Sequence, residues 1–490
     1  MVFSSIEFLY FYLPAVLVLY YITPRRFKNA MLFASGLVFY AFGEPVYVFI
    51  LLLSCAIDYF AGIVMSKHDD SQKIRRACLI TSVVMNLGLL GVFKYTSFIV
   101  ETVNSIFGVS IPLNIYAGLS NSIFGTHFSL SRIILPIGIS FFTFQSMSYT
   151  IDLYMRKIEV QRSFVDFAAY VTMFPQIVAG PIVRYKDVSA ELSERKVTVE
   201  MLSDGVSRFV KGLAKKVLLA NNIGSLWNEV KAMDYSTLPV LTAWLGIIAF
   251  TLQIYFDFSG YSDMAIGLGK MLGFRFPENF DLPYTSRSVR EFWRRWHMTL
   301  GEWFKNYVYI PLGGSRGGML KTLRNLAIVW LLTGMWHGAS WNFLLWGAWF
   351  GLLIIIERLF LGKILDKLPG FFPWLYTILA VVFGWVIFDT DSVASAAAYI
   401  GAMFGAGGAL YDTDSFWLLC EYSVMISLGV FFASDAPKNI CERTDQRFAE
   451  AGAKIGIFKL VEPLVTLLLL TASTAYLVNQ SYNPFLYFNF

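Results

Sequence analysis

Charged residues are scarce in this chain of 490 residues: they make up 15% of it, whereas hydrophobic residues make up 56%. Soluble proteins carry about 25% charged residues, so this composition excludes a soluble globular protein. The four cysteines are isolated and form no C-x-x-C pair. The spacing therefore gives no sign of a redox pair or a cysteine-bound metal, and we expect packed thiols at Cys55, Cys78, Cys420 and Cys441.

The common catalytic signatures are also absent from the sequence. It has no G-x-S-x-G elbow, no H-E-x-x-H zinc helix and no G-x-x-x-x-G-K-[ST] phosphate loop. Nor does an H-x4-D pair occur at His337, because the residue five positions later is Asn342. Metal catalysis and a serine nucleophile therefore have no support, and we expect no bound metal or cofactor.

Long apolar runs fill most of the chain. A bilayer core about 30 Å thick needs about 20 apolar residues per helical span, and by that measure roughly nine to eleven candidate segments lie between Ile6 and Val478. The first segment has no positively charged start and no small-residue cleavage site before Arg25, so we expect a retained helix. The sequence thus predicts an all-α polytopic membrane protein that forms a single membrane domain over residues 1–490.

The charges are unevenly distributed along the chain, and their distribution predicts the topology. Lys and Arg gather on the cytoplasmic side of membrane proteins, and the most basic region, Tyr284–Asn325, carries eight of them against two acids. No Lys or Arg lies between Trp374 and Pro437, as expected of an external loop between two spans. We therefore place Tyr284–Asn325 at the cytoplasmic surface, together with Arg25–Lys28, Lys67–Arg76, Arg156–Arg162 and Arg184–Lys196.

Three segments depart from a simple span. Gly43-Glu44-Pro45 divides Ala30–Phe42 from Val46–Met65, which predicts a helical hairpin. Prolines and a glycine interrupt Val165–Val183, so we expect a broken, re-entrant segment buried in protein. Val206–Ala220 interleaves Lys and Arg with apolar residues, and we expect it to lie along the cytoplasmic interface.

His337 lies in an apolar, tryptophan-rich run, Trp330–Trp341. This run belongs to Leu326–Ile356, a segment with basic flanks that is too long for one ordinary span and too short for two. If the segment enters from the cytoplasm and turns back at Gly338-Ala339-Ser340, His337 lies roughly 17 Å deep, near the middle of the membrane. A single tilted helix is the alternative.

An ionisable ring at membrane depth is costly, about 2.5–3.5 kcal/mol on insertion scales. A neutral imidazole, the form that burial favours, can take a proton from a hydroxyl and return it to a leaving group, which suits acyl transfer from a thioester to an alcohol. The alternative for His337 is a hydrogen bond to a neighbouring helix and nothing more. His297, in the aromatic and basic stretch E-F-W-R-R-W-H, either orients an acyl donor or is an ordinary interfacial side chain. His68 and His127 lie in polar loops.

Two aspartates, Asp257 and Asp263, lie among aromatic residues at the end of an apolar segment. They are candidates for positioning a substrate hydroxyl or for pairing with an arginine such as Arg294. A capped helix end at the interface is the alternative. The glycine-rich, basic run Pro311–Lys321 suits a phosphate contact through backbone N–H groups, or is a flexible linker.

Six long motifs follow one another along the chain. They are P-I-G-I-S-F-F-T-F-Q-S-M-S-Y-T-I-D (Pro136–Asp152), F-P-Q-I-V-A-G-P-I-V-R (Phe174–Arg184), Q-I-Y-F-D-F-S-G-Y-S-D-M-A-I-G-L-G (Gln253–Gly269), the block Asn279–Gly314, G-M-W-H-G-A-S-W-N-F-L-L-W-G (Gly334–Gly347) and Y-N-P-F-L-Y-F (Tyr482–Phe488). In this order they resemble the membrane-bound O-acyltransferase family, in its bacterial alginate O-acetylation branch. The resemblance places a catalytic core at about residues 133–360.

This resemblance implies a helical bundle around a central funnel or tunnel that holds the catalytic histidine. The family's catalytic histidine maps onto His337, and the histidine of W-R-R-W-H maps onto His297 as a second functional residue. Their motif neighbours are candidates for binding the donor or the substrate, together with the two aspartates: Arg294, Arg295, Trp296, Trp336, Asn342, Asp257 and Asp263.

The resemblance also implies a reaction and its partners. An acetyl group is taken from a cytoplasmic thioester, either acetyl-CoA or an acylated carrier protein, and passed towards a cell-surface polysaccharide. The expected partners are a separate extracytoplasmic esterase-like (SGNH) acetyltransferase, the polysaccharide acceptor and the lipid bilayer of a bacterial cytoplasmic membrane, and not nucleic acid. Whether the acceptor is alginate, cellulose, another exopolysaccharide or peptidoglycan stays open.

Three rival functions stay open beside this one. D-alanyl transfer to teichoic acid is the nearest, since related proteins perform it from a carrier-protein thioester. A small-solute transporter would predict inverted repeats, and no clear internal symmetry is visible in the sequence. A scaffold for polysaccharide export would leave His337 dispensable.

Overall fold

The computed structural model describes residues 1–113, 135–450, 456–479 and 485–486. Within these ranges the regular structure is helical, apart from one isolated bridge between Phe280 and Trp296, which confirms the all-α prediction. Seven helical runs of the described chain are long and apolar enough to cross a membrane, and two shorter apolar helices, Phe8–Ile22 and Val393–Met403, accompany them. The total of these helical segments lies at the lower end of the roughly nine to eleven apolar segments predicted from the sequence.

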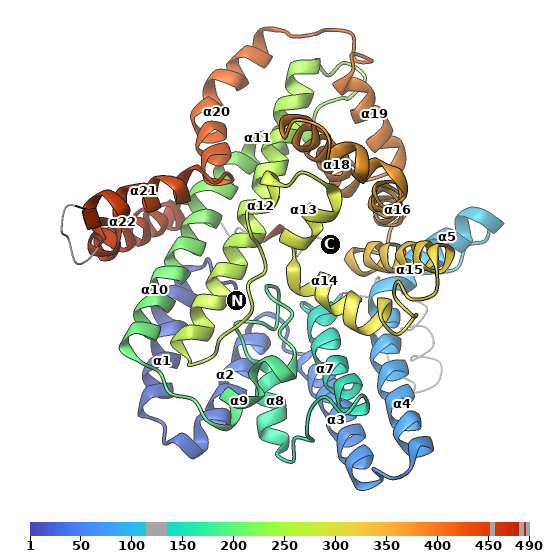
Figure 1. Cartoon of the computed structure of the whole chain (residues 1–490), viewed down its shortest axis with the longest axis vertical. Coiled ribbons are helices and arrows are strands. Elements are labelled where there is room, and N and C mark those ends of the chain that lie inside the picture. Colours follow the sequence, from blue (N-terminus) through green and yellow to red (C-terminus); the bar gives the residue numbers. More distant parts are fainter. Residues whose placement is uncertain (114–134, 451–455, 480–484, 487–490) are drawn as a thin grey trace.

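The first part of the chain forms the group of helices in the lower half of Figure 1, except for α5, which lies at the right edge beside α15. Its members are α1 (Leu13–Ile22), α2 (Lys28–Gly43), α3 (Val48–Lys67), α4 (Gln72–Leu90), α5 (Thr96–Phe107), α7 (Ile139–Tyr154), α8 (Phe164–Thr172) and α9 (Tyr185–Ser193). A π-helical turn, η3 (Gly91–Tyr95), joins α4 to α5, so that Gln72–Phe107 is one continuous helical run. The predicted hairpin is confirmed, because α2 ends at Gly43 and α3 begins at Val48.

The segment between α8 and α9 has no regular structure. Residues 173–184 are not helical, and residues 173–183 are all buried. Irregular backbone is tolerated at membrane depth only where protein or a water-filled cavity surrounds it, and here protein does. This confirms the predicted break of the helix within Val165–Val183.

The 32-residue helix α12 (Val240–Met271) runs through the centre of the molecule (Figure 1). α10 (Val199–Ala214), the π-helical turn η4 (Lys215–Ala220) and α11 (Asn221–Lys231) pack along it. A Cβ placed on Gly212 would lie 2.5 Å from the carbonyl oxygen of Gly260, so small residues let the two backbones touch. One face of the segment 206–220 therefore packs against α12, where Lys216 of η4 is only 2% exposed, while Val206 on another face is 40% exposed. Its position along the cytoplasmic interface stays a prediction.

The remaining helices complete the upper half and the edge of Figure 1. They are α13 (Val289–Arg295), α14 (Met298–Phe304), α15 (Met319–His337), α16 (Trp341–Ile356), α17 (Gly362–Leu365), α18 (Phe371–Asp389), α19 (Val393–Met403), α20 (Thr413–Phe432), α21 (Ala436–Glu450) and α22 (Ile457–Asn479). α21 and α22 lie side by side at the edge of the molecule. Cys55 is buried, Cys78 is partly buried and packs against the core, and Cys420 is exposed, so the prediction of packed thiols is confirmed for Cys55 and Cys78 and is wrong for Cys420.

α15 and α16 form a hairpin that turns directly after His337. The turn occupies residues 338–340, as the small residues there predicted, which excludes a single tilted helix over Leu326–Ile356. The helices can approach closely because each has a glycine at the contact. A Cβ placed on Gly347 would overlap the carbonyl oxygen of Trp330 and lie 3.2 Å from the Cα of Gly334. The hairpin therefore holds His337 at its closed end.

Replacing Gly347 with valine should force α15 and α16 apart. The atoms in the way belong to the backbone and to a second glycine, and overpacking of this kind costs about 1–3 kcal/mol. We expect a lower midpoint of thermal unfolding in detergent. The matched control is Gly88→Val in α4, where an added Cβ meets no atom within 4 Å. Equal unfolding midpoints for the two variants would contradict the predicted close contact.

Candidate active site

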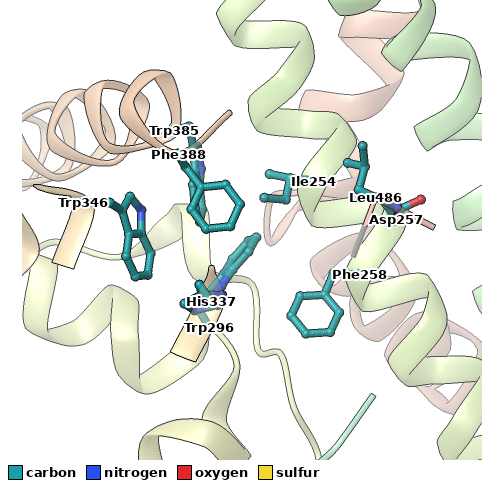
Figure 2. A pocket seen from close by; sticks show the side chains of 9 residues that line it. All are labelled: Ile254, Asp257, Phe258, Trp296, His337, Trp346, Trp385, Phe388 and Leu486. Carbon is teal, nitrogen blue, oxygen red and sulfur yellow. Dashed lines mark hydrogen bonds between the residues drawn. The ribbon is translucent and has the colours of Figure 1, made fainter. Parts of the chain in front are cut away.

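His337 is the last residue of α15 and is buried, with 5% of its surface exposed. It borders a cavity of about 20 Å³ in the interior of the bundle (Figure 2). α12 supplies one side of this cavity, and Trp346, Trp385 and Phe388 stand opposite (Figure 2). The full lining is Ile254, Asp257, Phe258, Trp296, His337, Trp346, Trp385, Phe388 and Leu486. A space of this size holds one water-sized group.

Aromatic side chains surround the His337 imidazole. Its centroid lies 4.8 Å from the ring of Trp346, 5.1 Å from Trp336 and 5.5 Å from Phe388, each in an edge-to-face arrangement. Its Nδ1 is buried and has no hydrogen-bond partner among the described residues. The ring is thus oriented by packing on several sides, and one of its nitrogens has no protein partner there.

His297 is held in an unusual backbone conformation between α13 and α14. Its φ is +45°, in the left-handed region, which is uncommon for a residue other than glycine and costs about 1–2 kcal/mol. The neighbouring bridge between Phe280 and Trp296 and the hydrogen bond from Met298 N–H to the Asn279 carbonyl fix the turn. Strained conformations of this kind persist only when the surrounding structure imposes them, and they cluster at functional sites.

The hydrogen bonds of Asn279 determine which ring nitrogen of His297 carries the hydrogen. The Asn279 side-chain oxygen accepts from Thr299 N–H at 3.3 Å and from the Thr299 hydroxyl at 2.9 Å. Because a backbone N–H can only donate, the amide atom that faces it must be the oxygen. The same oxygen lies 3.1 Å from His297 Nδ1, so Nδ1 must carry the hydrogen and donate it. Nε2 then keeps a lone pair, as an acceptor of a hydrogen bond or a proton.

His297 borders a second cavity, of about 210 Å³, between α13–α14 and α15. Its Nε2 is buried and has no partner within the described part of the chain. Tryptophan, phenylalanine and aliphatic side chains form most of the lining, and Lys305 and Tyr309 also contribute to it. The cavity has room for a narrow chain, and His297 Nε2 can accept one hydrogen bond from a group that occupies it.

Trp336 lies between the two histidines. Its ring centroid is 5.1 Å from that of His337 and 5.9 Å from that of His297. Trp296 lines both cavities. The structure therefore brings together four of the predicted site residues, His337, His297, Trp296 and Trp336, around one aromatic centre.

Asp257 also reaches this centre, but its carboxylate already has partners. It forms a buried ion pair of 2.5 Å with Lys216, and its second oxygen accepts from Leu486 N–H at 2.9 Å. Lys216 in turn lies over the ring of Phe485, 4.7 Å from its centroid. The predicted role of Asp257 in binding the donor or the substrate stays a prediction. Its observed contacts anchor residues 485–486 beside the His337 cavity.

The other predicted residues lie away from the cavities of the two histidines. Asp263 pairs with Arg208 and Lys215 in a separate cleft of about 360 Å³. Arg294 is exposed on α13, where it is not paired with Asp257 or Asp263. Arg295 and Asn342 already have partners within the protein. Arg295 binds Glu291 at 3.0 Å, and Asn342 donates to the Thr390 carbonyl.

Sequence reasoning missed several residues of the centre. Asn279 and Lys216 bind predicted site residues, and Trp385, Phe388 and Leu486 line the His337 cavity. Asn279 begins one of the long motifs, and Leu486 lies in the terminal one, so the motifs carried a signal for both. For Lys216, the signal was a lysine amid apolar residues. Within the described residues no group of three His, Cys, Asp or Glu side chains comes together as a metal site would require.

These features define a class: an all-helical membrane protein whose interior holds two buried histidines beside cavities. The chain matches the membrane-bound O-acyltransferase family over residues 156–399. It is 38% identical to the probable alginate O-acetylase AlgI of Azotobacter vinelandii, over the whole of both chains. It is 30% identical to the peptidoglycan O-acetyltransferase of Helicobacter pylori, over all of this chain and 98% of the relative. The teichoic acid D-alanyltransferase of Streptococcus thermophilus is 30% identical over 46% of this chain and 58% of that one.

The chain therefore belongs to the membrane-bound O-acyltransferase family. It is a multi-pass membrane protein and an O-acyltransferase.

Proposed function

We propose that this enzyme transfers an acetyl group from a cytoplasmic thioester towards hydroxyl groups of an extracytoplasmic polysaccharide. The observation that carries the proposal is His337, buried at the closed end of a hairpin beside a cavity for one small group. Similarity over the full chain to proteins named as alginate and peptidoglycan O-acetyl-transferring enzymes supports it.

The dimensions of the His337 cavity favour a short acyl group. About 20 Å³ is available, and Trp346, Trp385 and Phe388 form a wall with large, closely packed rings. A methyl group is close in size to the single water that such a space holds. A longer acyl chain would have to displace an aromatic ring, which supports acetyl as the group transferred.

His337 would act as the general base. It takes the proton of the acceptor hydroxyl while the hydroxyl oxygen forms a bond to the thioester carbonyl carbon. The C–S bond then breaks, and the proton passes from the imidazole to the leaving thiolate. The products are an ester and a free thiol, and the histidine returns to its neutral form.

His297 would position the thioester. It borders the larger cavity, which suits a narrow donor arm, and it contacts Trp336, which also contacts His337. The donor, acetyl-CoA or an acylated carrier protein, would approach from the basic face around Arg287–Arg324, where Arg294 is exposed. In this proposal residues 1–490 act as one membrane domain with its catalytic core at about residues 133–360.

The proposal includes an acceptor and a partner outside the membrane. The relatives' names favour a polysaccharide or peptidoglycan acceptor. We propose that an extracytoplasmic esterase-like (SGNH) acetyltransferase completes the transfer, as the resemblance to this branch of the family implies.

Cells that lack this protein should lose acetyl ester from their surface polysaccharide, and a plasmid copy should restore it. The measurement is acetate released by mild alkali from purified polymer, with D-alanine ester assayed in the same extracts. Loss of acetate alone supports the proposal. Loss of D-alanine would instead assign teichoic acid as the acceptor, and no change in either ester would refute both and favour a transport or scaffold role.

A further inference from the structure

The C-terminal end of α15, where His337 lies, is bound by a second helical run. A helix leaves the carbonyl groups of its last four residues without partners inside the helix. In α15 these residues are 334–337, and each of their carbonyls has a partner. The Gly334 carbonyl accepts from Gly338 N–H at 3.4 Å, and the other three accept from side chains of the π-helical turn η3.

Two consecutive residues of η3 bind those three carbonyls. The Tyr95 hydroxyl donates to the Met335 carbonyl at 2.5 Å. Lys94 Nζ donates to the carbonyls of Trp336 at 2.6 Å and His337 at 3.0 Å. A longer contact, 3.4 Å, joins Lys94 Nζ to the Ser140 hydroxyl of α7. π-helical turns often mark functional sites, and this one faces the end of the helix that carries His337.

Lys94 is an unusual residue for this place. Its side chain is buried within the membrane-spanning run Gln72–Phe107, with 8% of the residue exposed. Among the described residues no carboxylate lies within ion-pair distance of it. Its amino group instead faces the negative end of the α15 dipole, where donors and cations are stabilised. A lysine at membrane depth is expensive and is by default a candidate for function.

We propose that Lys94 is a positioning residue that fixes the last turn of α15 and so the location of His337. The inference rests on the proposed role of His337 as the base. The chain reverses at Gly338, so without Lys94 the final turn would lose donors for two buried carbonyls and would fray. A displacement of about 1 Å of a catalytic group costs on the order of 100-fold in rate.

The same helical run supplies a matched control. Arg75, at the other end of α4, is 2% exposed and donates to the carbonyls of Leu153 and Tyr154 at 2.9 and 3.0 Å. These are the last residues of α7, which ends at Tyr154. Arg75 is thus a second buried basic side chain at a helix C-terminus, although it also pairs with Asp69 at 2.5 Å. It lies 19 residues or roughly 28 Å along the helical run from Lys94, and α7 does not carry His337.

The test compares Lys94→Met, Lys94→Arg and Arg75→Met at matched membrane levels. Both methionine variants should lower the thermal unfolding midpoint in detergent, since each removes a buried helix cap. Only Lys94→Met should lower the acetyl ester of the surface polysaccharide, by about 10-fold or more. Lys94→Arg keeps the charge and several donors, so it should retain most of the acetyl ester. A role in folding alone would not produce this difference.

Two results would overturn the proposal. One is full acetylation by Lys94→Met in cells where His337→Ala abolishes it, since the base would then be placed correctly without Lys94. The other is loss of acetylation in a stable Lys94→Arg variant, which would point to chemistry at the amine itself. If Lys94→Met does not accumulate in membranes, Tyr95→Phe tests the neighbouring contact of η3 with the same helical turn, at the Met335 carbonyl. This variant removes one neutral hydrogen bond and should lower the acetyl ester about 2-fold to 5-fold. Unchanged acetylation would count against the proposal.

Discussion

Replacing His337 with alanine should abolish acetylation of the surface polysaccharide and leave the protein in the membrane at its normal level. A general base contributes about 10²–10⁴-fold to a reaction rate, so we expect at least a 100-fold loss of acetyl ester. The fold should persist, because the described interactions of the imidazole are ring contacts. They include no side-chain hydrogen bond between helices. The measurement is acetate released from polymer, normalised to the amount of protein in membranes.

The control for this variant is His68→Ala. His68 is the C-cap residue of α3, and its exposed ring bonds only within its own turn, to the Val64 carbonyl at 3.1 Å. Acetylation should be unchanged. His337→Gln is a second useful variant, since it keeps much of the side-chain volume and removes the base. Substantial acetylation by His337→Ala, in cells with no other acyltransferase of this kind, would exclude His337 as the catalytic residue.

The sequence predicted the hairpin of α15 and α16 because three physical requirements meet in it. The apolar segment is too long for one span, it has basic flanks, and its run of three small residues directly follows His337. The same reasoning gave the break after α8, where prolines and a glycine oppose a continuous helix. For residues 206–220 it predicted an amphipathic segment but not its partner, since charge periodicity alone does not show which helix the apolar face contacts. Gly205 and Gly212 allow that face to approach α12 closely.

Site residues could be predicted from the sequence where the residue type and its sequence neighbours are informative. They could not be predicted where their role depends on a contact with another segment. His337 and His297 could be identified as polar rings in apolar, aromatic surroundings. Their partners could not, because Asn279 is 18 residues from His297 and Lys94 is 243 residues from His337. Lys94 lies at the border of an apolar segment, where a lysine is expected to extend to the interface. Only the packing of η3 against α15 reveals that it is turned inward.

His297→Asn should lower acetylation by about 100-fold or more, the second largest effect that we expect. Asparagine tolerates the left-handed backbone, so the turn between α13 and α14 should survive, while the acceptor nitrogen at Nε2 is lost. The measurement is again acetyl ester per amount of membrane protein, together with the thermal unfolding midpoint. A variant with a normal midpoint and normal acetylation would show that His297 is an ordinary buried side chain.

Variants of Asn279 make a sharper test of the hydrogen bond between His297 and Asn279. They leave the imidazole ring in place and change only the group that orients it. Asn279→Leu removes the oxygen that holds the hydrogen on Nδ1, so the ring can carry its proton on either nitrogen. At metal-binding histidines the loss of such a partner costs about 10–100-fold, and we expect a decrease in acetyl ester of about that order here. Asn279→Asp keeps an acceptor and should retain more acetylation than Asn279→Leu. Thr299→Val removes another donor to the same oxygen without touching the imidazole. If Thr299→Val lost as much acetylation as Asn279→Leu, the effect would lie in folding and not in the tautomer of His297.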